Sequence, residues 1–264
     1  MILPSASPGG VALTLAAAAA YAVPAAGAGR LSGPAARKAL LAAWVLHAAT
    51  LMWGLFGDAP RFGFAPALSV TAWLVLTVYA VETQMFPQLH ARWTLSGLGA
   101  AAVLLALAFP GTPLHMASPW LPLHWALGIA AYGLFAAAAV HAWMLQRVER
   151  TIRQGAEPQA GLPLLTLERL TFRFATAGFV LLTCTLVAGI FFSESLYGRA
   201  WRWDHKTVFS VLSWAVFASL LLGRLRFGLR GRRAVTVLYF GSVLLLLAYV
   251  GSRFVLEVVL GRVA

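Results

Sequence analysis

The sequence predicts an all-α protein, a polytopic bundle of about eight transmembrane helices that forms a single domain over residues 1–264. The first observation is composition, because 61% of the residues are hydrophobic and 11% are charged. Soluble domains are about half apolar and about a quarter charged. The second is that several apolar runs reach the roughly 20 residues at which a helix crosses the hydrocarbon core. The third is that the basic residues fall in short segments between these runs, as topology requires.

Eight helices are expected in chain order. The first contains Pro24, which should kink that helix or end it early. The longest connecting segment, residues 146–169, is charged and then rich in glycine and proline, so we interpret it as a linker. The expected ranges are 9–28, 39–56, 66–82, 94–110, 122–146, 170–194, 206–223 and 234–257.

Lysine and arginine are divided unevenly between alternate loops, with thirteen in one set and five in the other. The positive-inside rule places the richer set in the cytoplasm. Both termini are then expected on the outer side, and the segment WRWDHKT, residues 201–207, lies at the outer surface where the seventh helix begins. The net charge of +12 is thereby assigned to topology and anionic lipid headgroups. No nucleic acid partner is expected.

Candidates for catalysis are few. The one cysteine, Cys184, lies in an apolar run, which excludes an intrachain disulfide, a CxxC redox pair and a CxxCH haem-attachment site. With eight acidic residues in all, no carboxylate dyad, nucleophile–base pair or phosphate-binding glycine loop with a lysine is visible. We therefore expect that the protein is not an enzyme. The N-terminus lacks a basic segment, so the first apolar run is expected to be a retained span rather than a cleaved signal.

Two histidines are expected at matched depth on the outer side. His124 lies at the outer end of the fifth helix, and His205 at the outer end of the seventh. Histidine is the commonest ligand of metals and a frequent axial ligand of haem iron. Two helices that each present one histidine could hold an iron between them. The alternative is that both histidines anchor their helices to lipid headgroups.

Aromatic and basic residues surround these histidines. Indole rings at a membrane interface usually act as anchors, but a cluster can also stack on a flat macrocycle. Arginine and lysine there could pair with haem propionates, which are carboxylates. The segment SLYGRAWRW, residues 195–203, could lie flat on the bilayer as a short amphipathic piece. The tryptophans are Trp120, Trp125, Trp201 and Trp203, and the basic residues are Arg199, Arg202 and Lys206.

Ionisable residues inside spans are the remaining candidates. His47 lies near the middle of the second helix, where an ionisable group is costly and suggests a function. With His141 of the fifth helix it could form a second, inner site; the alternative is hydrogen bonding within the bundle. Arg253 and Glu257 are spaced i,i+4 and can form a structural pair. Alternatively, Arg253 could contact a haem propionate.

The segment YGRAWRWDHKTVFSVLSWAVFASLLLGRLR, residues 197–226, resembles the tryptophan-rich segment of cytochrome c assembly proteins. The family pattern reads roughly W-G-x-x-W-x-W-D-x-K-E before a membrane helix. Tyr197 replaces its first tryptophan, His205 its usual proline and Thr207 its glutamate. The matching positions are Gly198, Trp201, Trp203, Asp204 and Lys206.

These departures, the eight spans and the ending GSRFVLE resemble the HemX/YpjD-like branch, a divergent relative of the haem-handling CcsA and CcmC proteins. The specific match covers residues 124–135 and 197–257. The resemblance implies a bacterial inner-membrane protein that holds non-covalent haem b at the outer face between two histidines. His124 matches the first. Because no histidine follows position 205, His205 would serve as the second.

Three functions therefore stand at the level of sequence. The first is a haem-binding and haem-handling module of cytochrome c assembly type. The second is an interaction or regulatory subunit without haem that partners another membrane protein in metal or tetrapyrrole homeostasis. It is favoured by the changes at Tyr197 and Thr207 and by the lack of a histidine after position 205. The third is a small-molecule permease, which eight spans would allow, although no pair of broken helices or inverted repeat supports it.

Overall fold

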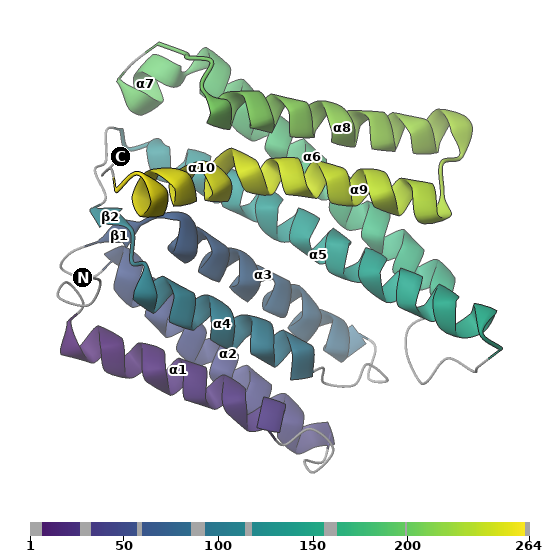
Figure 1. The fold of residues 1–264 in the computed structure, drawn as a ribbon, viewed down its shortest axis with the longest axis horizontal. Helices are drawn as coiled ribbons and strands as arrows, with labels where there is room; N and C mark the ends of the chain where they lie inside the picture. The colour runs from purple at the N-terminus through teal and green to yellow at the C-terminus, as the bar shows by residue number, and fades with distance from the viewer. Residues whose placement is uncertain are drawn as a thin grey trace. The chain divides into compact units, whose positions relative to one another are not determined.

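The computed structural model describes residues 7–26, 33–56, 60–85, 93–113, 118–155, 163–198 and 200–261. These residues are mostly helical (Figure 1). Within the described ranges, seven helices are long and apolar enough to cross a membrane, and an eighth apolar helix, Leu95–Ala108, is shorter. The expected all-α, polytopic membrane protein is thereby confirmed. The count of eight spans and the outward placement of both termini stay predictions.

The chain divides into two compact units. The first comprises Met1–Leu114 together with Arg253–Ala264, and the second comprises His115–Ser252. Both ends of the chain therefore belong to the first unit. Each unit is described by itself below.

Among its described residues, the first unit contains four main helices and a short strand pair (Figure 1). The helix α1 packs on α2 and α4, and α3 packs on α4. The C-terminal segment of this unit continues in helical form from Arg253 to Val259. The elements are α1 (Pro8–Ala26), α2 (Gly33–Phe56), β1 (Arg61–Phe62), α3 (Phe64–Met85), α4 (Trp93–Ala108), β2 (Thr112–Pro113), most of α10 (Ser252–Phe254) and η2 (Val255–Val259).

The strands β1 and β2 are an addition to the purely helical prediction. They pair antiparallel, with Arg61 opposite Pro113 and Phe62 opposite Thr112. Gly111 precedes β2 with a φ of +80°, and a Cβ there would lie 2.5 Å from the carbonyl of Phe62. Only glycine combines that conformation with so close an approach. Two-residue strands have no periodicity that a sequence pattern could reveal.

A glycine and a tyrosine determine how closely α1 and α4 approach. Tyr21 of α1 is fully buried, and a Cβ at Gly99 of α4 would lie 2.6 Å from the Cζ atom of Tyr21. Small residues are frequent at helix contacts in membranes because they let neighbouring helices pack closely. Here the missing side chain at position 99 makes room for the Tyr21 ring.

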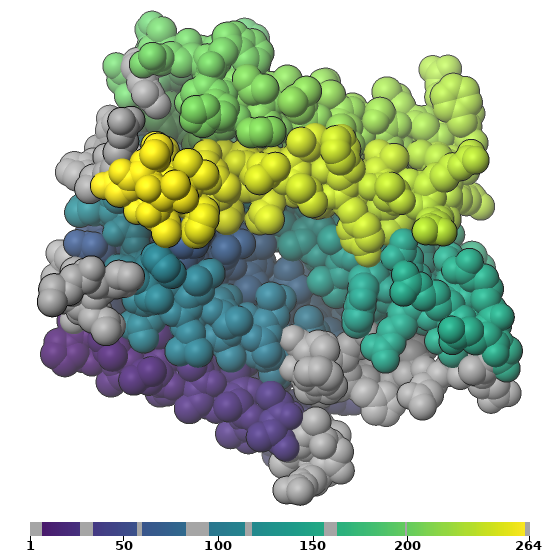
Figure 2. Space-filling model, viewed as in Figure 1, coloured from purple at the N-terminus to yellow at the C-terminus, as the bar shows by residue number. Residues whose placement is uncertain are grey.

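The second unit contains α5 (Leu121–Arg153), α6 (Leu164–Phe191), α7 (Ser193–Tyr197), α8 (His205–Phe227), α9 (Gly231–Leu246) and η1 (Leu247–Gly251). The long pair α5 and α6 packs together, as do α8 and α9. Figure 2 shows the side chains of α8 and α9 filling the space between the two ribbons.

A stack of two phenylalanine rings forms the centre of the second unit. Phe135 of α5 and Phe217 of α8 lie parallel, with ring centroids 3.7 Å apart and planes at 9°. Glycines cover both outer faces of the stack. A Cβ at Gly178 of α6 would lie 3.2 Å from the Phe135 ring, and one at Gly241 of α9 would lie 2.8 Å from the Phe217 ring. Four helices are thus held together by one aromatic stack between two glycines.

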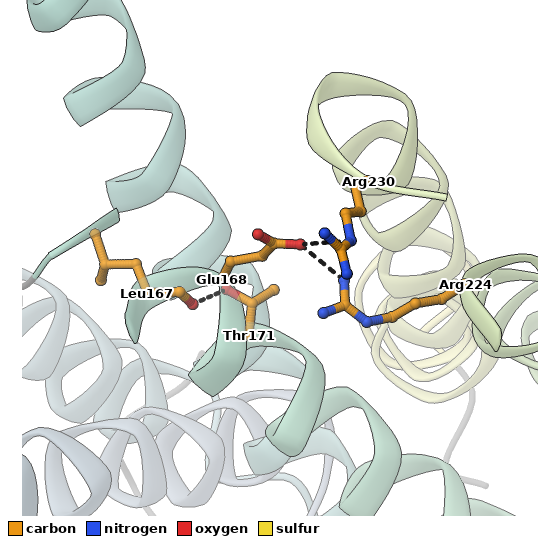
Figure 3. Close-up of polar contacts among 5 residues, drawn as sticks. All are labelled: Leu167, Glu168, Thr171, Arg224 and Arg230. Atoms are coloured by element: carbon orange, nitrogen blue, oxygen red, sulfur yellow. Dashed lines mark hydrogen bonds and ion pairs between the residues drawn. The ribbon is translucent and has the colours of Figure 1, made fainter. Parts of the chain in front are cut away.

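An ion-pair cluster joins α6 to the end of α8 (Figure 3). The Glu168 carboxylate accepts a hydrogen bond from Arg224 at 2.9 Å and lies 3.8 Å from Arg230. The guanidinium of Arg224 also lies 3.6 Å from the centroid of the Phe172 ring. One carboxylate thereby partly neutralises two of the arginines that the positive-inside rule assigns to the cytoplasm.

The expected linker over residues 146–169 is too long. Helix α5 continues to Arg153 and α6 begins at Leu164. Residues 146–153 are charged but contain no glycine or proline, so the helix continues after the apolar run ends. It stops before Gly155, which has a φ of +72°. The end of the apolar run and the end of the helix are therefore two different positions, and the helix ends just before the glycine.

The final helix departs from the regular α-helix expected over 234–257. Two π-helical turns, Leu247–Gly251 and Val255–Val259, flank the short α10. Such turns are rare and often occur near functional sites. Here Glu257 lies within the second turn and Arg253 lies in α10 between the two turns, so the turns contain or flank the charged pair identified in the sequence.

Candidate functional site

The segment WRWDHKT forms the entry to helix α8. Helix α7 ends at Tyr197, and Gly198 follows with a φ of +65° in the left-handed region. Residues 200–204 have no regular structure, so the expected flat segment is helical only in its first part. Asp204 then caps α8, since its carboxylate accepts a hydrogen bond from the Thr207 backbone N–H at 2.9 Å. An aspartate at this position is a strong signal for the start of a helix.

A cavity of about 140 Å³ lies in the second unit between this segment and helices α5 and α6. It joins residues from three parts of the chain: the start of α5, the end of α6 and the segment that leads into α8. The residues important for the argument are His124, Gly189, Tyr197, Trp201, Arg202 and Lys206.

The imidazole of His124 has an unused nitrogen. Its Nδ1 atom is buried and finds no hydrogen-bond partner among the described residues. Buried polar atoms are normally paired, and each exception needs an explanation. The ring of Tyr197 meets the His124 ring edge to face, with centroids 5.7 Å apart and planes at 89°. Tyr197 therefore contacts the imidazole ring without forming a hydrogen bond to the Nδ1 atom of His124.

Gly189 of α6 allows His124 and Trp201 to approach the same point. A Cβ on this glycine would lie 3.4 Å from Cζ3 of Trp201 and 3.6 Å from Cε1 of His124. A larger side chain would extend from there into the cavity. Sequence reasoning missed Gly189; a glycine in the apolar run VAGIFF was the available signal.

Two cationic residues complete this site. Arg202 is exposed, and its side chain lines the cavity with that of Lys206. The Lys206 ammonium also lies 5.2 Å from the centroid of the Tyr249 ring. Arg199, the third basic residue considered, lies outside the described residues. The cavity thus combines an imidazole, an indole and two cations.

The structure does not bring every predicted site residue to this cavity. His205 is the first residue of α8 and is exposed, with its side chain outside the cavity lining. Trp203 is 69% exposed and meets Trp201 edge to face at 5.9 Å. Trp125 is half-buried on α5 and is also absent from the lining. A ligand pair of His124 and His205 therefore stays a prediction.

His47 lies in the first unit, where both of its ring nitrogens are hydrogen-bonded. Its Nδ1 is 3.0 Å from the Tyr21 hydroxyl, and its Nε2 is 2.8 Å from the Ser69 hydroxyl. The imidazole is fully buried. This arrangement agrees with hydrogen bonding within the bundle, through the hydroxyls of two side chains. Cofactor binding by His47 stays a prediction that requires one of these bonds to break.

The remaining candidates also have partners. His141, in the second unit, is 3% exposed, and its Nδ1 lies 2.8 Å from the Ala137 carbonyl oxygen. In the first unit, Arg253 lies 3.5 Å from Glu257. A Cβ at Gly63 would lie 2.8 Å from Glu257 Oε2, so this carboxylate packs closely on the start of α3. The i,i+4 pair is present, and contact between Arg253 and a propionate stays a prediction.

The residues at the cavity are chemically suited to haem. An imidazole nitrogen without a hydrogen bond can ligate iron, an indole can cover a porphyrin face, and arginine and lysine can pair with carboxylates. Among the described residues no group of three or more His, Cys, Asp and Glu side chains could hold a metal ion. A single imidazole instead suits a metal that arrives with its own macrocyclic ligands.

The chain was compared with known proteins. A family model described as Cytochrome C assembly protein matches residues 34–260. The inner membrane protein YpjD of Escherichia coli (strain K12) is 34% identical over 145 residues, which is 54% of each protein, so the match spans about half the length of that relative.

Two further relatives extend this likeness. An uncharacterised 28.8 kDa protein of Azospirillum brasilense is 30% identical over 224 residues, covering 79% of this chain and 81% of that protein. The cytochrome c biogenesis protein CcsA of Gloeobacter violaceus is 34% identical over 92 residues, or 35% of this chain and 27% of CcsA. No solved structure matches. With seven apolar helices long enough to span a membrane, the chain is a multi-pass protein of the bacterial inner membrane and belongs to the cytochrome c assembly protein family.

Proposed function

We propose that this protein binds haem b non-covalently and handles it in cytochrome c biogenesis, with His124 as an axial ligand. The observation that supports this proposal is the buried Nδ1 of His124, which lines a cavity and has no hydrogen-bond partner among the described residues. Family membership supports the same class of function. A haem bound there would supply the iron, and the chain would supply its ligand and its surroundings.

Each residue at the cavity has a distinct proposed role. His124 provides the imidazole nitrogen, and Tyr197 restricts the tilt of that ring by its edge-to-face contact. Trp201 offers an indole surface beside Gly189, near the same point as His124. Arg202 and Lys206 stabilise propionates by ion pairs with hydrogen bonding. Trp203 and Trp125 would anchor the surrounding segment at the membrane interface.

The size of the cavity favours temporary binding. Its volume of about 140 Å³ is below the roughly 300–1,000 Å³ of pockets that enclose drug-sized ligands. A macrocycle is therefore not enclosed by this cavity and would keep part of its surface accessible. Such exposure suits a protein that receives haem and passes it on, a binding and handling module rather than an enzyme with its own turnover.

In this proposal His205 is the second residue that would hold the iron. Because His205 is exposed at the first turn of α8, that turn would have to bring its side chain toward the cavity. The same exposure favours the second candidate function, an interaction or regulatory subunit without haem whose partner is another membrane protein. The two candidates differ in whether the purified protein binds haem at all.

The test is the visible absorption spectrum of protein purified in detergent from haem-replete cells and then titrated with haemin. A b-type spectrum with saturable, stoichiometric Soret absorbance is expected. Replacement of His124 by alanine should diminish it strongly, and replacement of His205 should alter it if that residue is the second ligand. Protein that shows no Soret absorbance even after addition of haemin contradicts the proposal. Co-purification of a stoichiometric membrane partner would then favour the regulatory subunit.

A further inference from the structure

The first unit contains a separate cavity of about 220 Å³. Its walls come from α1, α2, α3, α4 and the strand β1, the group of elements around α1 and α4 in Figure 1. Apolar side chains such as Leu51, Val70 and Val103 form part of the lining. The polar lining includes Ser7, Arg61 and Ser69. The cavity is therefore amphipathic, with hydrogen-bonding groups beside hydrocarbon.

A chain of hydrogen bonds ends at this cavity. It joins Tyr21 of α1, His47 of α2 and Ser69 of α3 through contacts of 3.0 and 2.8 Å. All three side chains are buried, and a neutral imidazole has one donor and one acceptor nitrogen. Two directions are therefore possible, and they differ in which hydroxyl proton is left without an acceptor.

Each direction leaves one buried hydroxyl proton without an acceptor among the described residues, but only the direction from Tyr21 to Ser69 leaves that proton at the cavity, where a ligand can accept it. If Nδ1 carried the proton, the Tyr21 hydroxyl would accept it, and its own O–H would have no acceptor among the described residues. An unsatisfied buried donor costs about 1–3 kcal/mol. If Tyr21 instead donates to Nδ1, Nε2–H donates to Ser69, and the free proton belongs to Ser69 Oγ at the cavity wall. A ligand can accept that hydrogen bond.

Ser7 and Arg61 offer donors in the same way. The Ser7 hydroxyl oxygen accepts hydrogen bonds from the Gly10 N–H and the Trp53 indole N–H, both at 3.2 Å. Its own O–H is therefore left to donate. Arg61 uses one guanidinium nitrogen for the Gly111 carbonyl oxygen at 3.1 Å. A guanidinium carries five N–H donors, so several are left for a ligand.

Two other hydroxyls in the lining have donated their protons elsewhere. Thr14 donates to the Gly10 carbonyl oxygen at 2.7 Å, and Thr50 donates to the His47 carbonyl oxygen at 2.7 Å. Among these described lining residues, the donors left for a ligand are thus the hydroxyls of Ser7 and Ser69 and the guanidinium of Arg61. A group that only accepts hydrogen bonds and carries negative charge complements them.

We propose that this cavity binds the head of an amphipathic molecule whose polar end is an anionic oxygen group, a carboxylate or a phosphate, and whose body is a hydrocarbon chain. The anionic oxygens accept hydrogen bonds from Arg61, Ser69 and Ser7. The first carbons of the chain contact Leu51, Val70 and Val103. Trp53 is 53% exposed at the cavity wall, so the cavity reaches the surface of this unit and a longer tail can leave it.

The test is equilibrium binding of radiolabelled palmitate to the full chain purified in detergent. Methyl palmitate has the same tail without the negative charge, and a phosphatidylglycerol of matched acyl length presents a phosphate. We expect that palmitate binds saturably. Unlabelled methyl palmitate should compete at least about tenfold less well than unlabelled palmitate, because one hydrogen bond to a charged group accounts for about that factor. If phosphatidylglycerol competes at a lower concentration than unlabelled palmitate, the anionic group comes from a phospholipid. If phosphatidylglycerol competes less well than palmitate, the anionic group is a free carboxylate.

Matched variants locate the site. Arg61→Gln and Ser7→Ala should each weaken palmitate binding at least about fivefold to tenfold. Thr14→Val and Thr50→Val, which remove hydroxyls already bonded to the backbone, should leave it within about twofold. Ser69→Ala should also weaken binding, and its thermal unfolding shows whether loss of the His47 partner has disturbed the fold.

Two results would overturn the proposal. One is competition by methyl palmitate that equals competition by palmitate, and the other is an equal effect on binding of the threonine variants and the Arg61 and Ser7 variants. The readout is independent of haem.

Discussion

The imidazole of His124 and the ring of Tyr197 meet edge to face, with centroids 5.7 Å apart and planes at 89°. Tyr197 occupies the position of the first tryptophan in the family motif, so this departure from the motif lies in direct contact with the proposed haem ligand. The contact leaves the Nδ1 atom of His124 without a hydrogen-bond partner among the residues that the structure describes. Gly189 and the segment that leads into α8 line the cavity next to His124, so the shape of this cavity depends on both.

Replacing Gly189 by leucine should abolish haem binding while His124 is still present. A Cβ at this position makes ordinary contacts of 3.4 Å with Trp201 and 3.6 Å with His124, so alanine should be tolerated. The further carbons of leucine would occupy the cavity. Haemin titration followed by Soret absorbance compares the two variants. Equal binding by the leucine and alanine variants would show that haem does not use this cavity.

Replacing Asp204 by alanine should destabilise the start of α8. Its carboxylate accepts a hydrogen bond from the Thr207 N–H, and loss of such a cap costs about 0.5–2 kcal/mol. Asparagine can cap a helix equally well, so Asp204→Asn should retain most of the stability. Thermal unfolding in detergent measures both. If asparagine is as harmful as alanine, the negative charge rather than the cap is required.

Gly241→Ala should destabilise the second unit, although alanine normally favours a helix over glycine. A Cβ there would lie 2.8 Å from the fully buried Phe217 ring, which is stacked on Phe135 and cannot easily move. Overpacking of this kind costs about 1–3 kcal/mol. Gly128→Ala is the control, since its Cβ would meet Thr185 Cγ2 at 3.5 Å and should be neutral or stabilising. Comparable melting temperatures for the two variants would contradict the described packing.

Glu168→Gln should weaken the junction of α6 and α8 by about 1 kcal/mol or less, because the ion pairs are partly exposed and Arg224 keeps its contact with Phe172. The loss should shrink at high ionic strength, where salt screens such pairs. Glu194→Gln, in which an exposed glutamate is changed, should have little effect at any salt concentration. A loss for Glu168→Gln that is independent of salt would contradict an electrostatic origin.

The fold class followed from the sequence because bilayer thickness imposes a length on every apolar run. Helix ends were less predictable, since α5 continues past the apolar run until it stops just before Gly155. The capped start of α8 is visible in the pattern Asp204 to Thr207. The pair β1 and β2 was not predictable, because two residues per strand carry no periodic signal.

The candidate site was predictable in part. His124, Trp201, Arg202 and Lys206 line one cavity, and these residue types at a membrane interface suggest haem from the sequence alone. His205 was paired with His124 on depth alone, and depth does not determine which way a side chain points. The cap by Asp204 places His205 at the first position of α8, where its side chain is exposed. Gly189 is important through the side chain that it lacks, which residue chemistry alone does not reveal.

The most direct test of the account is the visible spectrum of His124→Gly protein with haemin, before and after addition of imidazole. Glycine removes the ligand and leaves a space of the same shape as the lost ring. The account predicts that the Soret absorbance of the wild-type protein is largely lost in this variant and is restored by imidazole in a concentration-dependent way. An unchanged spectrum in His124→Gly, without imidazole, would contradict ligation by His124.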